Sequence, residues 1–598
     1  MILQSLNDLY ARLQDDPNEE DIAPYGFSRQ NISFRVVLED DGSLFAIEPY
    51  TDDTSGKDRP VRMVVPGGAK PSGSGINPGL LWDNTQYLLG FKADDTNPDR
   101  TRATFEAFRD RHVELAADKE HGPSDPVFDA VAKFLAEWDP EAIGETRQKA
   151  LADLLPGFGV FQMRSSGDYA HDSPGFREWW LAGLAAGEED PKGSMTAMCL
   201  VTGQTAPIAR LHEPRIKGVV GAQSSGHPLV SFNSNAYESH GFDGGFNAPV
   251  SQEAAFRYCT ALNRMLAPSS DRKLRIGDAT TVFWTAKPSP AEALFGAAID
   301  PTDADDEVKK RVQTTLEAIA DGRPADGLDD LEVPFFVLGL APNAARSVVR
   351  FWHQSTVGDM AERLAAHFAA LRIVPSFPKD PPLPAVWQLL RETAREAKDI
   401  PPLLPGAVMR AILTGSPYPQ SFLAALVRRI RADREVPYLR AAAIKACLVN
   451  SPRVNSPQPQ EIPVSLNPDR PEEAYQLGRL FACLERAQED ALGRDLNATI
   501  RDKFFGAASA TPASVFPRLM RLSQHHLSKV KSDSPGKAVV ADKRIQEVCG
   551  RLEGFPKHLN LRQQGLFAIG YYHQRRDFFT KKDDATETAS EAENAEAS

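Results

Sequence analysis

The sequence predicts an α+β protein, in which a mixed N-terminal domain with short antiparallel strands is followed by a helical C-terminal bundle. Short apolar runs separated by turn residues fill much of the first part of the chain and are typical of strands. Longer stretches with apolar residues at helical spacing fill the last part, where proline-rich segments interrupt them. At 598 residues the chain exceeds what one hydrophobic core holds, so we expect about two to four domains.

The N-terminal elements follow from local patterns. Residues 2–13 carry apolar side chains at helical spacing and predict a first helix. Residues 32–50 predict a β-hairpin with Asp-Asp-Gly at its turn, and residues 61–66 predict another strand. Residues 67–79 form a loop rich in glycine, serine and proline, and residues 101–160 hold two helical patterns.

The middle of the chain mixes strands and loops. Residues 195–285 end in the strand pattern ATTVFWT, and residues 300–310 have the pattern of a solvated helix start after a linker. Residues 333–352 begin as a buried strand and turn at Ala341-Pro342-Asn343. We expect this segment to continue from the turn into a long helix.

Proline-rich segments indicate where the C-terminal part divides. They lie at residues 373–385, 400–405 and 451–463, and the last is the strongest candidate for a domain boundary. Beyond it, the helical patterns predict a small bundle. The predicted divisions are a mixed α+β domain at 1–330, a helical connecting region at 331–463, a helical bundle at 464–580 and an acidic disordered tail at 581–598.

Charge is distributed unevenly along the chain. The net charge of −13 by itself argues against a nucleic-acid partner. Residues 471–582 nevertheless hold 19 Lys and Arg against 12 Asp and Glu, whereas residues 583–598 hold 6 acidic residues and no basic one. A locally basic bundle can therefore contact a nucleic-acid backbone although the whole chain is acidic.

Composition argues against two classes of protein. No run of about 18 apolar residues occurs, and the N-terminus has no basic region before an apolar block, so we expect neither a membrane span nor a signal peptide. The expected location is the cytoplasm. The cysteines are odd in number and form no CxxC pair, so we expect free, mostly buried thiols at Cys199, Cys259, Cys447, Cys483 and Cys549.

Known catalytic motifs are absent from the sequence. GxSxG, Walker A, GxGxxG and HExxH patterns do not occur, and the histidine pairings at 171–172, 212–213 and 525–526 lack metal-ligand spacing. Cys199 begins a segment similar to a zinc knuckle, but Thr202 stands where the second thiolate would be. We therefore expect a protein that is not an enzyme and has no catalytic residue, metal site or cofactor. A metal-dependent nuclease assembled from distant positions stays open as an alternative.

Two polar segments are candidates for reading DNA. The Gly67–Gly79 loop combines five glycines with small polar side chains, which fit a narrow minor groove better than bulky ones. The Ile216–Leu266 segment is dense in amides and hydroxyls and ends in a helix. We expect it either to contact DNA or to form a buried polar framework beneath the loop, although an ordinary surface loop is the commoner use of such a composition. The candidate motif-reading residues are Lys70, Ser72, Ser74, Asn77, Gln223, Ser225, Asn233 and Asn235.

Four cations are candidates for holding a nucleic-acid backbone. Arg215 and Lys217 lie at the start of the polar segment, and Arg518 and Arg521 recur along a helix of the basic bundle. Such side chains suit phosphate contacts and a single strand. A solvated helix face explains the same charges nearly as well.

Four segments carry a resemblance to a known family. They are MILQSLNDLY at the N-terminus, VPGGAKPSGSGINPGLLWDNTQYLLG, the SFN…NAPVS core of the polar segment, and VLGLAPNAARSVVRFW, in that order. Together they resemble the large-subunit family of type I-C CRISPR surveillance complexes (Cascade). The resemblance covers residues 1 to about 580 and leaves out the acidic tail.

The resemblance implies a binding role within a ribonucleoprotein. Such subunits sit beside the 5′ handle of the CRISPR RNA, next to backbone and handle-binding subunits, and recognise a protospacer-adjacent motif in double-stranded DNA. They help to open the duplex, hold the displaced strand and recruit a separate helicase-nuclease. Their C-terminal bundle resembles the small subunit of related complexes. A scaffold subunit without direct DNA readout is the other alternative that stays open.

Overall fold

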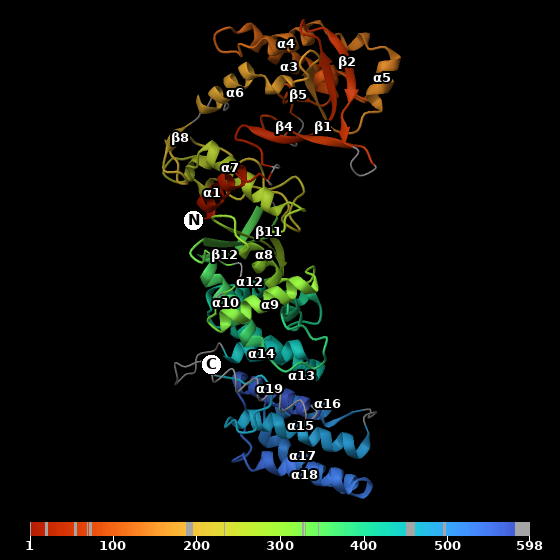
Figure 1. The fold of residues 1–598 in the computed structure, drawn as a ribbon, viewed down its shortest axis with the longest axis vertical. Coiled ribbons are helices and arrows are strands. Elements are labelled where there is room, and N and C mark those ends of the chain that lie inside the picture. Colours follow the sequence, from red (N-terminus) through yellow and green to blue (C-terminus); the bar gives the residue numbers. More distant parts are fainter. Residues whose placement is uncertain are drawn as a thin grey trace. The chain divides into compact units, whose positions relative to one another are not determined.

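The chain divides into two compact units in the computed structural model (Figure 1). The first unit holds Met1–Ser270 with Asn343–Ser347, and the second holds Asp271–Pro342 with Val348–Ser598. The divisions at 330 and 463 rest on composition rather than compactness and stay predictions. The structure describes residues 2–17, 19, 22–52, 57–68, 70, 75–186, 195–232, 234–323, 325, 328, 330–344, 346–449, 461–493 and 498–579.

A six-stranded sheet organises the first unit around its long strand β1, Phe27–Leu38. The first half of β1 pairs antiparallel with β4, Arg59–Pro66, and the second half pairs antiparallel with β2, Leu44–Pro49. On its other side β1 pairs in parallel with β6, Phe158–Met163. The short strands β3, Thr51–Asp52, and β5, Trp82–Asp83, complete the sheet.

The predicted hairpin and the strand that follows it are confirmed by β1, β2 and β4. Gly42 at the hairpin turn has φ +84°, a conformation that glycine adopts without steric cost. A Cβ atom at this position would lie 2.7 Å from the carbonyl oxygen of Ala130 in helix α4, Pro126–Glu137. Backbone geometry and close packing therefore both require the glycine of the Asp-Asp-Gly turn.

Helices pack on the sheet and complete the core of the first unit. Phe34 of β1 and Phe161 of β6 join Phe108 of helix α3, Pro98–Ala117, and Phe128 of α4 in one buried cluster. Burying a phenylalanine completely contributes about 1.5 to 3 kcal/mol. These are the two helices predicted within residues 101–160. A third helix, α5 at Glu145–Ala152, was missed because Leu151 is its one buried residue, so its apolar pattern is weak.

The predicted N-terminal helix and the helix that ends the polar segment pack against each other. They are α1, Ile2–Gln14, and α7, Gln252–Leu266. Ser251 caps α7 by accepting a hydrogen bond from the amide of Ala254 at 3.2 Å. Further α-helices and strands in the described part of this unit are α2 at Thr85–Leu89, α6 at Pro174–Ala186, β7 at Thr196–Met198 and β8 at Thr205–Pro207.

The second unit begins with a four-stranded sheet in the order β12-β11-β10-β9. The strand predicted from ATTVFWT is confirmed as β10, Ala279–Thr285. The long helix predicted after Asn343 is wrong, because the chain returns as strand β12, Arg346–Thr356, and α10 begins only at Val357. The other two strands are β9, Lys273–Ile276, and β11, Pro334–Asn343.

Aromatic packing explains why the segment after Asn343 is a strand. The ring of Trp352 lies 5.8 Å from Phe336 on β11 and 5.7 Å from Trp284 on β10, measured between centroids. Such rings on neighbouring strands stabilise a sheet, and β-branched and aromatic residues favour strands. Val348 and Val349 add to this preference. Packing of Trp352 against rings on β10 and β11, helped by the strand preference of Val348 and Val349, therefore outweighed the apparent helical spacing of RSVVRFW.

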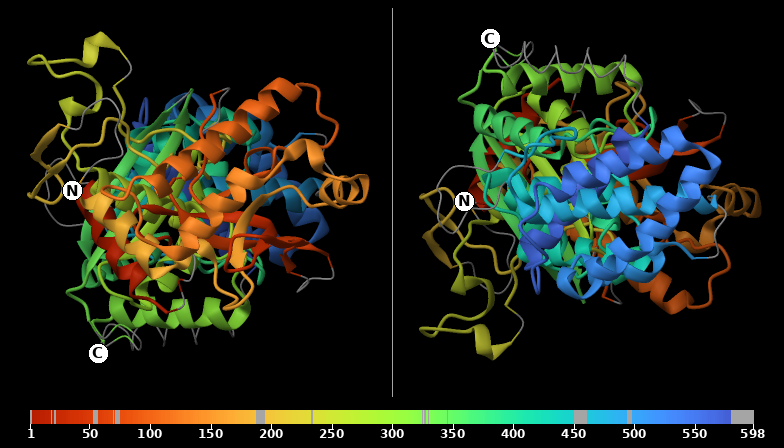
Figure 2. Two further views of the ribbon diagram at one scale, coloured as in Figure 1. Left: turned by 90° about the horizontal axis from the view of Figure 1, so that it is seen from above. Right: turned by 90° about the horizontal axis from the view of Figure 1, so that it is seen from below.

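Helices make up the rest of the second unit, in agreement with the predicted α+β class. Helices α15 to α19 form the predicted C-terminal bundle, drawn in shades of blue in the right-hand view of Figure 2. Helix α15 contacts α17, α18 and α19. The predicted helix start at 300–310 is confirmed by α9, which Asp305 caps. The helices are α8 at Ala291–Ile299, α9 at Asp306–Ala320, α10 at Val357–Leu371, α11 at Val386–Arg391, α12 at Leu404–Thr414, α13 at Gln420–Asp433, α14 at Tyr438–Val449, α15 at Glu473–Leu492, α16 at Ile500–Ala508, α17 at Pro512–Asp533, α18 at Pro535–Cys549 and α19 at Leu561–Asp577.

Two glycines allow α15 and α19 to approach closely. A Cβ atom on Gly478 would lie 2.0 Å from the carbonyl oxygen of Phe567, and one on Gly570 would lie 2.1 Å from that of Tyr475. Neither side chain could be added without moving a backbone. The bundle therefore depends on glycine at both positions, although glycine costs a helix interior about 1 kcal/mol relative to alanine.

The sequence-based expectations about cysteines and hydropathy can be compared with the structure. All five cysteines are free thiols, four of them buried and Cys549 partly buried, as predicted. Among the described helices, none is both long and apolar enough to cross a membrane.

Candidate nucleic-acid interface

Lys70, a predicted DNA contact, is turned toward the protein. Its ammonium donates to the carbonyl oxygen of Asn77 and forms an ion pair with Asp83, and its side chain is 20% exposed. The nitrogen also lies 4.1 Å from the centroid of the Tyr87 ring, a cation–π contact. Lys70 therefore anchors the Gly67–Gly79 loop. Ser72 and Ser74 lie outside the described residues.

The carboxylate that holds Lys70 is completely buried. Asp83 follows Trp82 on β5 and accepts hydrogen bonds from the amides of Gly79 and Asn84, both at 2.8 Å. Burial raises the pKa of Asp83 and lowers the pKa of Lys70, while each charge opposes the shift of the other. Two amide donors and one cation around one carboxylate favour the ion pair. The Asp83 carboxylate thus holds the loop at Lys70 and at Gly79.

Asn77 is the described candidate residue of this loop that is exposed to solvent. The backbone amide of Asn77 donates a hydrogen bond to the hydroxyl of Tyr87 at 3.2 Å. The next residue, Pro78, accepts a hydrogen bond from Arg111 at 2.8 Å. Tyr87 and Arg111 therefore hold the backbone at residues 77 and 78, while the Asn77 residue stays exposed.

Arg215 and Lys217 are held on the same side of an extended segment by one asparagine. Asn263 of α7 donates to the carbonyl oxygen of Arg215 at 3.0 Å and accepts from the amide of Lys217 at 2.7 Å. Ile216 between them is completely buried, whereas both cations are exposed. Since alternate residues of an extended chain point to opposite sides, the two cations project together toward solvent.

Backbone hydrogen bonds close the loop that follows. The backbones of Ile216 and His227 exchange hydrogen bonds of 2.8 and 3.0 Å, so residues 217–226 form a loop with joined ends, here called the closed loop. Gly218 turns at φ +88° with its Cα against the carbonyl of Leu266, where an added Cβ would lie 2.5 Å away. Gln223 and Ser225 are exposed within this loop. The loop therefore presents polar side chains from a braced base.

The expected buried framework is wrong for most of the polar residues in this segment. Gln223, Ser225 and Asn235 are exposed, and Asn233 lies outside the described residues. Asn247 does act as a brace: its amide nitrogen donates to the carbonyls of Phe242 and Gly244, and its oxygen accepts from the amide of Ser239. Glycine-rich loops with few apolar side chains cannot bury their own amides, which explains the exposure.

Arg518 and Arg521 lie on an exposed face of α17. Positions 518, 521, 525 and 529 recur at spacings of three and four, so Arg518, Arg521, His525 and Lys529 share one face of the helix. All four residues are exposed, while Leu519 faces the core. The guanidinium carbon of Arg518 lies 5.2 Å from the Phe504 ring. This face, here called the α17 stripe, is the basic surface predicted for the bundle.

Three residues of these sites were missed from the sequence. Asp83 directly follows three apolar residues. A single acidic residue in such a buried segment indicates that its carboxylate has a partner inside the protein. His525 was noted only as half of a histidine pair, although its spacing from Arg521 places it in the α17 stripe. Asn263 carries no sequence signal, because its partners lie 46 and 48 residues earlier.

Cys199, the candidate zinc-knuckle thiol, has structural partners. Within the described ranges, no group of three or more His, Cys, Asp or Glu side chains is arranged to hold a metal ion. The Cys199 sulfur accepts hydrogen bonds from the amides of Val201 and Ser251 at 3.4 and 3.2 Å. Burial acts to raise the pKa of this thiol, but hydrogen bonds from Ser251 and Thr202 lower it to about 7. The supposed knuckle is a turn bonded to the N-cap residue of α7.

The fold and these surfaces define an α+β protein with braced, exposed polar loops and a basic helix face. The family described as CRISPR-associated protein (Cas_Csd1) matches residues 6–579. The chain therefore belongs to this family, which confirms its resemblance to the large subunits of type I-C CRISPR surveillance complexes. No curated protein matches the sequence.

Proposed function

We propose that the chain recognises the protospacer-adjacent motif in duplex DNA as the large subunit of an RNA-guided interference complex. Asn77, Gln223, Ser225 and Asn235 contact base edges, while Arg215 and Lys217 hold the DNA backbone. Family membership supports the setting of this proposal. The observation that carries it is the closed loop 217–226, which presents Lys217 beside exposed amide and hydroxyl side chains, with the exposed Arg215 just before the loop.

The physical division of labour supports this role. Guide pairing reads most of the target, and the protein reads only a short duplex motif that starts strand exchange. Phosphate contacts fix the register of the protein on DNA, and base contacts carry the specificity. The exchange of one duplex for another is nearly balanced in free energy, so a few protein contacts decide whether it proceeds.

The remaining roles complete the proposal. The α17 stripe holds the displaced strand, and the chain recruits a separate helicase-nuclease without cleaving DNA itself. Its partners are the CRISPR RNA, target DNA, the backbone and handle-binding subunits and the small subunit, in the cytoplasm and without a cofactor. A chain with a negative net charge can bind nucleic acid in this way because its cations are gathered in local basic regions.

Substitutions in the closed loop test motif recognition. In the assembled complex, Gln223→Ala with Ser225→Ala should weaken duplex binding by about 1 to 3 kcal/mol per specific contact and reduce motif preference, with guide-RNA assembly intact. Gln204→Ala with Thr205→Ala, two exposed polar residues elsewhere in the same unit, is the matched control. Unchanged affinity and motif preference would contradict the proposal. Divalent-metal-dependent cleavage by the purified chain would instead favour a nuclease.

Charge reversal tests the α17 stripe separately. Arg518→Glu with Arg521→Glu should reduce the dependence of log K on log salt for single-stranded DNA by about 1.4, since each phosphate contact contributes about 0.7. Lys310→Glu with Arg311→Glu, on α9 of the same unit, changes the charge equally and controls for net charge. An equal salt slope in both variants would mean that the stripe is only a solvated face.

A further inference from the structure

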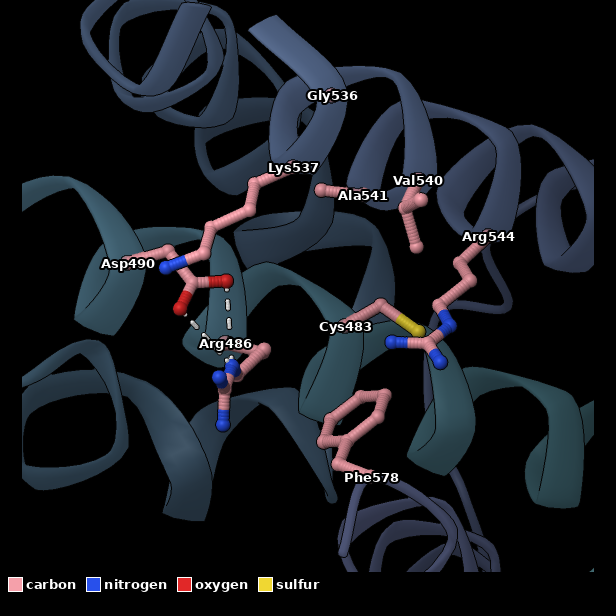
Figure 3. Close-up of a pocket in the computed structure, with 9 residues that line it drawn as sticks. All are labelled: Cys483, Arg486, Asp490, Gly536, Lys537, Val540, Ala541, Arg544 and Phe578. Carbon is pink, nitrogen blue, oxygen red and sulfur yellow. Dashed lines mark hydrogen bonds and ion pairs between the residues drawn. The ribbon is translucent and has the colours of Figure 1, made fainter. Parts of the chain in front are cut away.

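A cavity of about 250 Å³ lies in the C-terminal bundle between α15, α18 and the end of α19 (Figure 3). Arg486 and Asp490 of α15 line one side. From α18, the Lys537 side chain extends toward the end where Asp490 lies, and the Arg544 side chain extends toward Cys483 and Phe578. Val540 and Phe578 form an apolar wall. Lys537 and Arg544 are seven residues apart, two helical turns, so they share one face of α18.

The cations that line this cavity outnumber its acids. Arg486 is paired with Asp490 at 3.1 Å within α15. The guanidinium of Arg544 lies 5.1 Å from the centroid of the Phe578 ring. Among the described residues, neither Arg544 nor Lys537 has a carboxylate oxygen within 4.0 Å. The cavity therefore gathers two positive charges that an anion would stabilise.

The size and the chemistry of the lining select the kind of anion. A volume of about 250 Å³ is slightly below that of pockets for drug-sized ligands, about 300 to 1,000 Å³, so a single small unit fits. A guanidinium donates two parallel hydrogen bonds to phosphate oxygens, and an ammonium adds a point charge. The Phe578 and Val540 side chains offer an apolar surface for a sugar or base beside that phosphate.

We propose that this cavity binds the phosphate of a nucleotide unit, with Arg544 and Lys537 on the phosphate oxygens and the sugar or base against Phe578. The unit belongs either to a free nucleotide or to a nucleic-acid strand, since both present the same chemistry. The proposal goes beyond the function given above, because none of the residues assigned there lines the cavity.

The test uses the full chain and defined ligands. Titrations with thymidine monophosphate and with a short thymidine oligonucleotide, each in competition with inorganic phosphate, measure binding to wild-type protein and to the variants Arg544→Gln and Lys537→Gln. Loss of one charge-assisted hydrogen bond should weaken binding about tenfold. Lys543→Gln removes the same charge from an exposed position of α18 outside the lining and should have no effect.

The outcomes separate the source of the ligand from the existence of the site. If the variants bind both the monophosphate and the oligonucleotide more weakly, the natural ligand is a unit of a nucleic-acid strand. If they bind only the monophosphate more weakly, it is a free nucleotide. Absence of competition by phosphate, or equal weakening by Lys543→Gln, would overturn the proposal. If Arg544→Gln lowers the unfolding midpoint, the exposed Lys537 variant carries the test. Arg518→Glu with Arg521→Glu should leave monophosphate binding unchanged, which keeps failure of this site distinct from failure of the α17 stripe.

Discussion

The Lys70 ammonium pairs with the Asp83 carboxylate, which has no exposure to solvent, at the base of the Gly67–Gly79 loop. Lys70 was predicted to touch DNA, and the structure instead gives its charge a partner inside the protein. The pair stands beside the Tyr87 ring and two backbone amides. The internal ion pair thus holds the loop in place. Among the candidate residues of the loop that the structure describes, the exposed Asn77 is a better candidate than Lys70 for reading DNA.

Breaking this ion pair should destabilise the first unit. Lys70→Met leaves the Asp83 carboxylate buried without its cation, and we expect a loss of about 3 kcal/mol in the free energy of unfolding. Urea denaturation measures this loss. Lys92→Met, which removes an exposed lysine of the same unit, should change stability little.

A double variant separates the ion pair from the packing around it. Lys70→Met with Asp83→Asn should recover most of the stability lost in Lys70→Met, because the uncompensated charge is gone and an amide oxygen still accepts from Gly79. If the double variant instead lost as much stability as the two single variants together, the two residues would act independently.

Removing the brace of the closed loop should weaken both stability and DNA binding. Asn263→Ala deletes the amide that bonds to Arg215 and Lys217, and we expect about 1 to 3 kcal/mol of lost stability. Because Arg215 and Lys217 would no longer be held on one side, duplex affinity of the assembled complex should also fall. Asn7→Ala on α1 is the control. Unchanged duplex affinity at full folding would mean that the brace has no part in binding.

The same substitution should have opposite effects at two helix glycines of the bundle, Gly478 at the close crossing of α15 and α19 and Gly506 away from it. Gly478→Ala places a Cβ atom 2.0 Å from the Phe567 carbonyl, so it should destabilise the bundle by about 1 to 3 kcal/mol. Gly506→Ala, in α16 with 4.0 Å to its nearest neighbour, should stabilise by up to about 1 kcal/mol through helix propensity. Thermal unfolding of both variants decides. Equal shifts of the midpoint would contradict the close crossing of α15 and α19.

Buried histidines should make the protein sensitive to acid. Burial lowers the pKa to about 3 in His112, His367 and His573 and to about 4 in His212. In the unfolded chain these groups titrate near 6.5. Their folded pKa values are depressed, so stability is complete above about pH 6.5 and is lost as the pH falls toward the folded values.

The slope of stability against pH measures this effect. Each buried histidine should contribute up to about 1.4 kcal/mol per pH unit below 6.5. His573→Asn, whose amide can replace the 2.9 Å hydrogen bond to the Tyr475 hydroxyl, should remove the share of one histidine from the slope. His558→Asn, at an exposed position, should leave the slope unchanged. Identical slopes in all three proteins would contradict the assignment.

Local patterns predicted the elements whose cause is local. The Asp-Asp-Gly hairpin, the capped helix at Asp305 and the helical bundle all follow from turn chemistry, capping and periodicity. Strand β12 was missed because its stability comes from rings on two other strands. Spacing along one segment does not report such neighbours.

Long-range partners likewise limited the prediction of the site. Exposed polar side chains such as Gln223 and Ser225 were identified from composition. The role of Lys70 was not, because its carboxylate partner lies on another element. The Asn263 brace depends on packing between α7 and a segment nearly fifty residues away.

Site-specific photocrosslinking tests the central claim most directly. A photoreactive amino acid at position 225 or 77 is placed in the assembled complex, which is then loaded with labelled duplex carrying the adjacent motif. Direct readout predicts crosslinks from both positions to the duplex beside the motif, and their loss when the motif is scrambled. Crosslinks to protein neighbours alone, with DNA bound, would contradict the account and identify a scaffold subunit.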